Sequence, residues 1–249
     1  MSLRHANLKL KKVLQSVLRA PHSTFQTPEV IRQDLRNLLR ETAQPVAVVT
    51  SLMPSGAQHN VLHSHSRFHG ATLSSFSSIA LDPYPLVAFS LRIPSRMAMS
   101  LKSAHVSLPV ASHMVVNILS AAQVDTAVRF ARPDLHPDPF AGSPYFLSAE
   151  GLPVLKDSVG ALSCKLVAAS WPLHDLELLE GRSNEETVWE GEGVASELFI
   201  ARVTRVELLT DPEPKEDEKD LRTSPLLYYR RAYSTTRDIP GRSASETKS

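Results

Sequence analysis

A run of hydroxyl side chains in the first third of the chain is the feature best suited to bind a ligand. The segment from Gly70 to Pro85 reads GATLSSFSSIALDPYP, and its hydroxyl-bearing residues are Thr72, Ser74, Ser75, Ser77 and Ser78. Hydroxyl and backbone N–H groups at the end of a strand bind a phosphate and the polar edge of a planar ring. Arg92 and Arg96 follow, and a guanidinium matches the oxygens of a phosphate. The residues predict an anion site here, and an exposed serine-rich edge strand with two surface arginines is the alternative.

Four histidines precede this segment, namely His59, His63, His65 and His69. His63 and His65 would share one face of a strand, where two imidazoles can chelate zinc, copper or haem iron. No carboxylate or cysteine lies nearby in the sequence to complete such a site. We therefore predict solvent-exposed loop histidines and no metal site.

The elements that position these residues are mostly strands. Runs of β-branched or alternating apolar residues predict strands at 46–50, 70–78, 86–92, 104–109, 114–119, 159–169, 197–208 and 225–229. Apolar residues at helical spacing predict helices at 28–41 and 120–131, the first with a proline at its first position. Many short strands without regular strand–helix alternation indicate a mainly β fold of the barrel type with a few flanking helices.

The two ends of the chain differ from its middle. Residues 1–27 carry five basic residues and no acid, with apolar residues at helical spacing, which is the pattern of a mitochondrial transit peptide. A basic helix on a cytoplasmic protein is the alternative. Acidic stretches at 180–193 and 211–223 lack apolar periodicity and predict loops, and the polar tail at 236–249 is predicted to be disordered.

The bulk composition excludes several classes of protein. A net charge of +1 over 249 residues argues against a nucleic-acid binder, which requires a strong basic excess. The sequence has no run of about 18 or more apolar residues, so no membrane span is predicted. The single cysteine, Cys164, lies in an apolar strand pattern and is predicted to be a buried structural thiol. Only 9 glycines are present, and no glycine-rich phosphate loop is found.

The serine-rich segment resembles the flavin-binding signature of the flavin reductase-like family. The resemblance rests on GATLSSFSSI followed by DPYPLV, and further blocks follow in the same order. These blocks are Val115–Ser120 with Gln123, Ala127 and Phe130; Gly151–Leu155; the strand ALSCK at 161–165; and Pro225–Tyr233. The N-terminal pattern adds the prediction of a eukaryotic mitochondrial member, in which residues 28–235 form the flavin reductase-like domain.

The resemblance implies a homodimeric split β-barrel that binds FMN or, less often, FAD. It places the isoalloxazine and ribityl-phosphate against Thr72, Ser74, Ser75, Phe76, Ser77 and Ser78. The phosphate side then falls on Ser90, Arg92, Ser95 and Arg96. The implied activity is hydride transfer from NAD(P)H to the flavin, with reduced flavin released to a partner oxygenase; the flavin carries the chemistry, and the protein orients it.

The sequence departs from the family at one motif. Many members that use a nicotinamide carry Gly-Asp-His before the penultimate strand, and the aligned positions here are Val194, Ala195 and Ser196. His174 and Asp175 lie earlier in the chain. One interpretation is that His174 substitutes for the missing histidine from a displaced position; the alternative is that these are ordinary loop residues. The alternative function is therefore a flavin-binding module without reductase turnover, serving storage, sensing or assembly.

Overall fold

The computed structural model describes residues 27–53, 67–107, 110–183, 195–208 and 221–237. Two compact units divide the chain, Met1–Thr42 and Ala43–Ser249. In the first unit the predicted helix is confirmed as α2, Pro28–Arg40, which begins at a proline and has Glu29 in its first turn. Residues 1–26 of the predicted transit segment, most of the two acidic loops and most of the polar tail lie outside the described residues.

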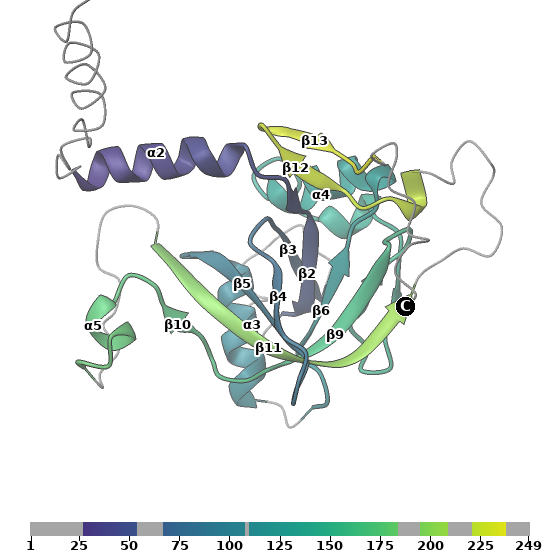
Figure 1. Cartoon of the computed structure of the whole chain (residues 1–249). Helices are drawn as coiled ribbons and strands as arrows, with labels where there is room; N and C mark the ends of the chain where they lie inside the picture. The colour runs from purple at the N-terminus through teal and green to yellow at the C-terminus, as the bar shows by residue number, and fades with distance from the viewer. Residues whose placement is uncertain (1–26, 54–66, 108–109, 184–194, 209–220, 238–249) are drawn as a thin grey trace, which may run out of the picture. The chain divides into compact units, whose positions relative to one another are not determined.

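The second unit is built on one antiparallel sheet, and the predicted mainly β fold is confirmed. Its strands run in the order β3-β2-β6-β9-β11-β5-β4 and curl into a half-barrel, with β10 paired to β11 (Figure 1). The strands are β2 Ala47–Leu52, β3 Phe68–Leu73, β4 Ser77–Ala80, β5 Leu86–Ile93, β6 Met114–Ile118, β9 Gly160–Leu166, β10 Trp171–Pro172 and β11 Ala195–Leu208.

Smaller elements surround this sheet. A three-stranded sheet joins β1 Gln44–Pro45, β12 Leu227–Tyr229 and β13 Ala232–Ser234, and a hairpin joins β7 Tyr145–Leu147 and β8 Pro153–Leu155. The helices are α3 Arg96–Ser107, α4 Val124–Ala131 and α5 Leu176–Leu179, with 3-10 turns at Ala121–Gln123 and Pro139–Gly142. Among the described residues, no helix is long and apolar enough to cross a membrane.

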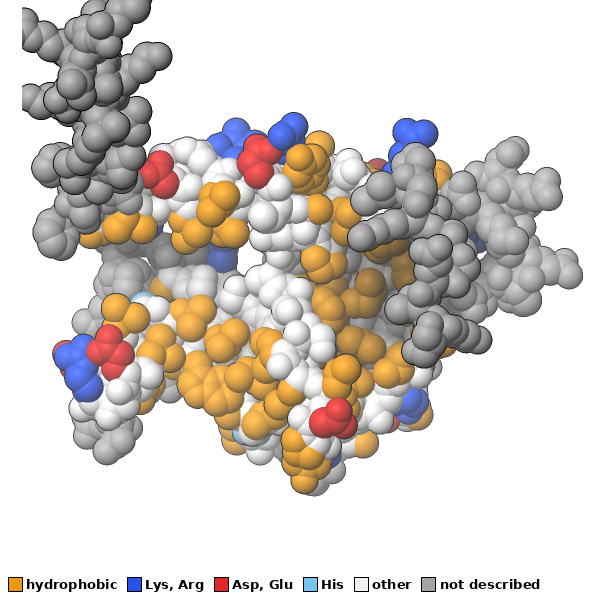
Figure 2. Space-filling model, viewed as in Figure 1, with side chains coloured by type: hydrophobic (Ala, Val, Ile, Leu, Met, Phe, Trp, Pro, Cys, Tyr) orange, Lys and Arg blue, Asp and Glu red, His pale blue; other side chains and the backbone are white. Residues whose placement is uncertain are grey.

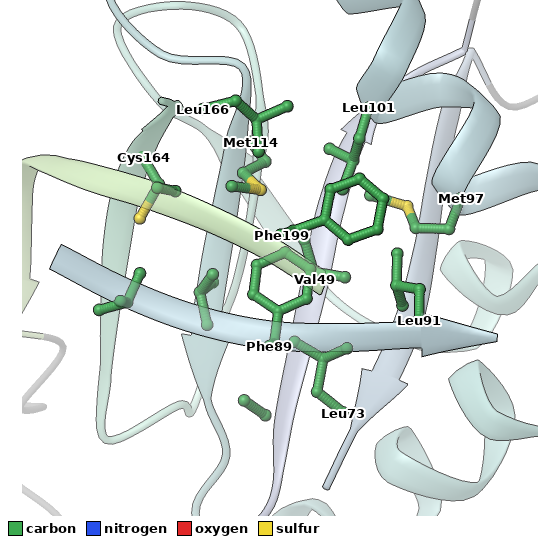
Figure 3. Close-up of a cluster of buried hydrophobic side chains, with 14 of the residues drawn as sticks. Val49, Leu73, Phe89, Leu91, Met97, Leu101, Met114, Cys164, Leu166 and Phe199 are labelled. Carbon is green, nitrogen blue, oxygen red and sulfur yellow. The ribbon is translucent and has the colours of Figure 1, made fainter. Parts of the chain in front are cut away.

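The hollow of the half-barrel is filled by apolar side chains from the sheet and α3 (Figure 3). Phe89 and Phe199 face each other across β5 and β11, and their rings stack with centroids 5.6 Å apart. Met97 and Leu101 extend this core from α3, and Cys164 is fully buried in it. This packing holds β5, β11 and the start of α3 in fixed relative positions, which matters for the cleft described below.

Two predicted strands are wrong. Residues 104–109 were expected to form a strand, but the described part of that range, to Ser107, ends helix α3. The helix forms because Met97, Ala98 and Leu101 lie at helical spacing and all three are buried in the core. The strand predicted at 70–78 is broken between β3 and β4, because the chain leaves one strand at Leu73 and begins the next at Ser77.

Candidate functional site

The serine-rich segment carries the chain from one edge of the main sheet to the other. β3 lies at one end of the strand order and β4 at the opposite end, so Ser74, Ser75 and Phe76 bridge the opening of the half-barrel. The Ser75 hydroxyl accepts a hydrogen bond from Ser90 N (2.9 Å) and donates one to Ser90 O (3.2 Å). Phe76 packs against the core. These two hydrogen bonds hold the segment Ser74–Phe76 against β5. The Ser75 hydroxyl then has no further proton to donate to a ligand.

Strand β3 is fastened on its other side to α4. The Thr72 hydroxyl donates to the carbonyl oxygen of Ala127 at 2.7 Å. Two residues earlier, the helix residue Phe130 lies so close to Gly70 that a Cβ atom on the glycine would be 2.6 Å from the ring. Thr72 and Gly70 thus hold the wall of the site. Because the proton of the Thr72 hydroxyl is used on α4, Thr72 can serve a ligand only as a hydrogen-bond acceptor.

The predicted phosphate residues gather where β5 leads into α3. Ser95 caps the helix, since its Oγ accepts from Ala98 N at 3.1 Å, and Arg96 is the first helical residue. Arg92 lies opposite Ser196 of β11 and is exposed. In the described part of the chain neither arginine forms an ion pair, whereas five others do. Two unpaired guanidinium groups beside a helix N-terminus favour an anionic ligand.

A cleft of about 860 Å³ opens between β3, β5, the start of α3 and the end of α4. Seven of the predicted residues line it: Thr72, Ser74, Ser75, Ser90, Arg92, Ser95 and Arg96. Phe76 does not, because it packs into the core, and Ser77 and Ser78 lie exposed on β4 outside the lining. The structure therefore brings together the two ends of the predicted site and leaves out its β4 portion.

Sequence reasoning missed several lining residues. His69, expected in a solvent-exposed loop, is instead the second residue of β3, where it is half-buried in the cleft wall. Burial and, secondly, the Arg96 guanidinium lower the pKa of His69 to about 4. Side chains alternate between the two faces of a strand. Extending the predicted strand back to Phe68 would have placed His69 in it, on the face opposite Phe68 and Gly70.

Tyr228 and Tyr233 reach the same cleft from the small sheet. Their rings meet edge to face with centroids 5.5 Å apart, and burial together with Tyr228 raises the pKa of Tyr233. Both residues lie more than 130 positions from the nearest arginine of the site in the sequence. No local pattern links them to it, and they are brought there by pairing between distant segments, including that of β1 with β12.

The structure describes two of the three residues that stand where many family members have Gly-Asp-His. Val194 lies outside the described residues, Ala195 begins β11, and Ser196 lines the cleft. The peptide N–H of Leu173 donates to Ser196 O at 2.9 Å, which brings His174 next to this strand. His174 is nevertheless not part of the cleft lining.

The other chemical candidates lie away from the cleft or outside the described residues. His59, His63 and His65 fall in the undescribed range, and the described residues hold no group of three or more potential metal ligands. Cys164 is buried as predicted, and burial raises the pKa of its thiol to about 12. The cleft is thus the candidate site that brings most of the predicted residues together.

Comparison with known proteins agrees with this arrangement. The flavin reductase like domain family matches residues 39–237. The chain is 32% identical over 134 residues to a flavin reductase from Pseudomonas putida, covering 54% of this chain and 67% of that protein. It is 30% identical over 137 residues to an FMN reductase (NADH) from Agrobacterium fabrum, covering 55% and 66% of the two chains. The solved styrene monooxygenase flavin reductase from Pseudomonas putida superposes with a TM-score of 0.56 at 22% identity, covering 82% of this chain and 99% of that one.

These relatives are bacterial and give no support to the eukaryotic mitochondrial origin predicted from the N-terminus. The structural likeness, at 22% identity, bears on the fold alone, and it agrees with the half-barrel sheet. The family match is independent of that likeness and covers most of the chain, including every residue that lines the cleft. The chain belongs to the flavin reductase like domain family.

Proposed function

We propose that this protein binds FMN in the cleft and reduces it with NAD(P)H. The observation that carries the proposal is that one cleft brings together Ser74, Ser90, Ser95 and two arginines that form no ion pair with any described residue. The names of the sequence relatives, a flavin reductase and an FMN reductase (NADH), support the same activity. FAD is the alternative flavin.

The residues present fit a phosphorylated flavin at one end of the cleft. Arg92 and Arg96 supply two positive charges, and the first turn of α3 adds backbone N–H groups that point out of the helix end. Charge-assisted hydrogen bonds from arginine to phosphate are among the stronger polar contacts in proteins. We assign the phosphate to this end of the cleft.

The remainder of the lining suits a planar ring with polar edges. Its apolar and aromatic members include Val46, Phe130, Tyr228 and Tyr233. The hydroxyls of Ser74 and Ser90 make no side-chain hydrogen bond within the described residues, so they are available to the ligand. A mostly apolar cleft with a few convergent polar groups, of several hundred Å³, is the usual form of a cofactor site.

The protein's contribution to the reaction is orientation. Bound flavin supplies the acceptor for the hydride that the nicotinamide donates. The residues of this chain hold the flavin by its phosphate and fix the cleft wall through the Ser75–Ser90 and Thr72–Ala127 hydrogen bonds. Since the hydride passes between two rings, no side-chain acid or base is required for that transfer.

Flavin titration of the arginine variants tests the site. We expect Arg96→Ala to weaken FMN binding by about 10- to 100-fold, because a hydrogen bond to a charged group contributes about 1.5–3 kcal/mol. Riboflavin, which lacks the phosphate, should bind the variant and the wild type alike. Arg132→Ala is the matched control, because Arg132 pairs with Asp134 on the surface and does not line the cleft. Equal losses for FMN and riboflavin would contradict the assigned phosphate end.

Oxidation of NADH and NADPH in the presence of FMN tests the reaction separately. A rate well above the enzyme-free rate is expected, and it should fall with Arg96→Ala at limiting FMN. Ser196 stands in the cleft where many nicotinamide-using members have a histidine, so the module without turnover remains the rival. Tight FMN binding with no nicotinamide oxidation would favour that rival and overturn the reductase.

We also propose that the chain forms a homodimer and delivers reduced flavin to a partner oxygenase. Large apolar side chains lie exposed on β4 and the turn that follows it: Ile79, Leu81 and Tyr84 are 49%, 74% and 59% exposed. Figure 2 shows hydrophobic side chains gathered over this side of the sheet. Sedimentation velocity tests the dimer, and a monomer at all concentrations would refute it. A likeness to the reductase of a styrene monooxygenase motivates the oxygenase partner.

For localisation we propose the mitochondrion, with the cytoplasm as the alternative. The support is the acid-free basic composition of residues 1–27. Sequencing the N-terminus of the native protein tests this proposal. A retained Met1 or Ser2 would refute it.

A further inference from the structure

His69 lies in the cleft wall near the residues assigned to the phosphate. It lies opposite Ser51 in the pairing of β3 with β2, and its side chain is half-buried. Within the described residues the imidazole makes no side-chain hydrogen bond. A ring nitrogen in a ligand cleft without a protein partner is a polar group that a ligand can satisfy.

The charged side chains closest to the strand of His69 come from three of the four elements that pack against it. β2, β5, α3 and α4 pack against β3, and β2 carries no ionisable side chain. The ionisable residues of the other three are Arg92, Arg96, Lys102, His105, Asp125 and Arg129. Lys102 forms an ion pair with Glu197, and the ring of His105 packs against that of His113. These two side chains of α3 are therefore engaged elsewhere.

The charge that acts on His69 is that of Arg96. Arg129 packs over Gly142, where a Cβ atom would be 2.5 Å from its guanidinium, and Asp125 is exposed on the surface of α4. In the absence of a ligand, burial and the Arg96 guanidinium lower the pKa of His69 to about 4. The imidazole is therefore neutral near neutral pH.

An anion bound beside Arg96 would reverse this balance. A phosphate monoester carries about 1.5 to 2 negative charges near pH 7. It would cancel the guanidinium charge and place negative charge near the imidazole, and both effects favour the protonated ring. Burial opposes protonation in the free and the bound protein alike, so the change on binding comes from the phosphate.

Building on the proposed flavin site, we propose that His69 belongs to its phosphate end and takes up a proton when a phosphorylated flavin binds beside Arg96. Binding and protonation are linked, so FMN binds more tightly as the pH falls from neutral toward the pKa of free His69. Each unit by which FMN raises the pKa of His69 strengthens binding by up to about tenfold. Riboflavin lacks the phosphate and gains nothing, so His69 makes selection for the phosphorylated flavin dependent on pH.

Calorimetry of the whole chain tests the proton uptake directly. FMN and riboflavin are each titrated at about pH 6 in two buffers that differ in ionisation enthalpy, since the pH lies in the range where histidine titrates. Proton uptake appears as a binding enthalpy that depends on the buffer. We expect uptake with FMN, none with riboflavin, and a smaller uptake with FMN for His69→Gln. The phosphate's own titration is common to wild type and variant, so it cancels in their difference.

Affinity across pH gives the second measurement. From about pH 7.5 to about pH 5.5, the preference for FMN over riboflavin should rise about 3- to 10-fold more in wild type than in His69→Gln. Equal pH profiles, or no net proton uptake by wild type relative to the variant, would overturn the inference. Should His69→Gln fail to fold, His69→Asn takes its place as the reference, because the contribution of the phosphate cancels only in the difference between wild type and a variant without the imidazole. A chain that binds neither flavin refutes the proposed function, whereas binding without proton uptake refutes only the role of His69.

Discussion

The contact between Gly70 and Phe130 gives a prediction whose size can be worked from the structure. In Gly70→Ala the new Cβ would lie 2.6 Å and 2.8 Å from two carbons of the Phe130 ring and 3.1 Å from Val49 O. Ordinary van der Waals contact begins at 3.4 Å, so the ring must retreat by about 0.8 Å. Phe130 is 3% exposed and meets Phe140 edge to face at 5.0 Å, which leaves the ring little room.

We therefore expect Gly70→Ala to cost about 1–3 kcal/mol, the usual range for overpacking a core. For a unit of this size that lowers the melting temperature by about 2–4 °C per kcal/mol. Both residues line the cleft, so FMN affinity should fall with stability. Thermal unfolding and FMN titration measure the two effects.

A double-mutant cycle decides whether the clash is the cause. Phe130→Leu removes the ring edge, so the cost of adding Gly70→Ala in that background should be at least about 1 kcal/mol smaller than in wild type. If the two substitutions add, the ring contact is not the source of the loss, and the reasoning from the close approach is refuted. Unchanged stability in Gly70→Ala alone would have the same meaning.

Three further outcomes follow from single side chains. Ser75→Ala removes two exposed hydrogen bonds to β5 and should lower the free energy of unfolding by about 0.5–1.5 kcal/mol. The control Ser74→Ala should change it by less than about 0.5 kcal/mol. Equal effects in thermal unfolding would contradict the role of Ser75 in holding the segment to β5. Free His69 has its pKa lowered from 6.5 to about 4, so the unfolded chain takes up the proton first. Stability of the flavin-free protein should fall by at most about 3 kcal/mol as pH drops from about 6.5 to about 4, and less steeply in His69→Gln; parallel pH profiles would contradict this. The Cys164 thiol, with its pKa raised to about 12, should react with a thiol reagent only on unfolding, and rapid labelling of the native protein would show otherwise.

Local sequence pattern was sufficient for much of the fold. The apolar spacing and initial proline of 28–41 predict α2, and alternation along 86–92 and 197–208 predicts β5 and β11. These elements were predictable because the periodicity that forms each one is written in its own residues. Helix α3 was not predicted, because Met97 and Leu101 form an apolar pattern too short to indicate a helix. The alternating residues that follow them indicate a strand instead.

The ligand-binding chemistry was also visible in the sequence, because the hydroxyl run, Arg92 and Arg96 lie within one stretch of chain. What the sequence did not reveal is which of these groups face the ligand. The hydroxyl groups of Thr72 and Ser75 donate hydrogen bonds to backbone carbonyls of α4 and β5. These hydrogen bonds form because the fold brings distant segments of the chain together. Whether a hydroxyl is a ligand donor or a structural fastener is decided by its neighbours in space.

By itself, the sequence determined the strand-rich composition, the phosphate-type residue set and the family resemblance, since each rests on neighbouring residues. Only the tertiary structure decided that β3 and β4 occupy opposite edges of the sheet, with the serine segment spanning the gap. It alone placed His69, Ser196 and Tyr228 in the cleft with the arginines. The physical reason is that a cleft is made where separate elements meet, and strand order and register, which set that meeting, depend on pairing across the whole chain.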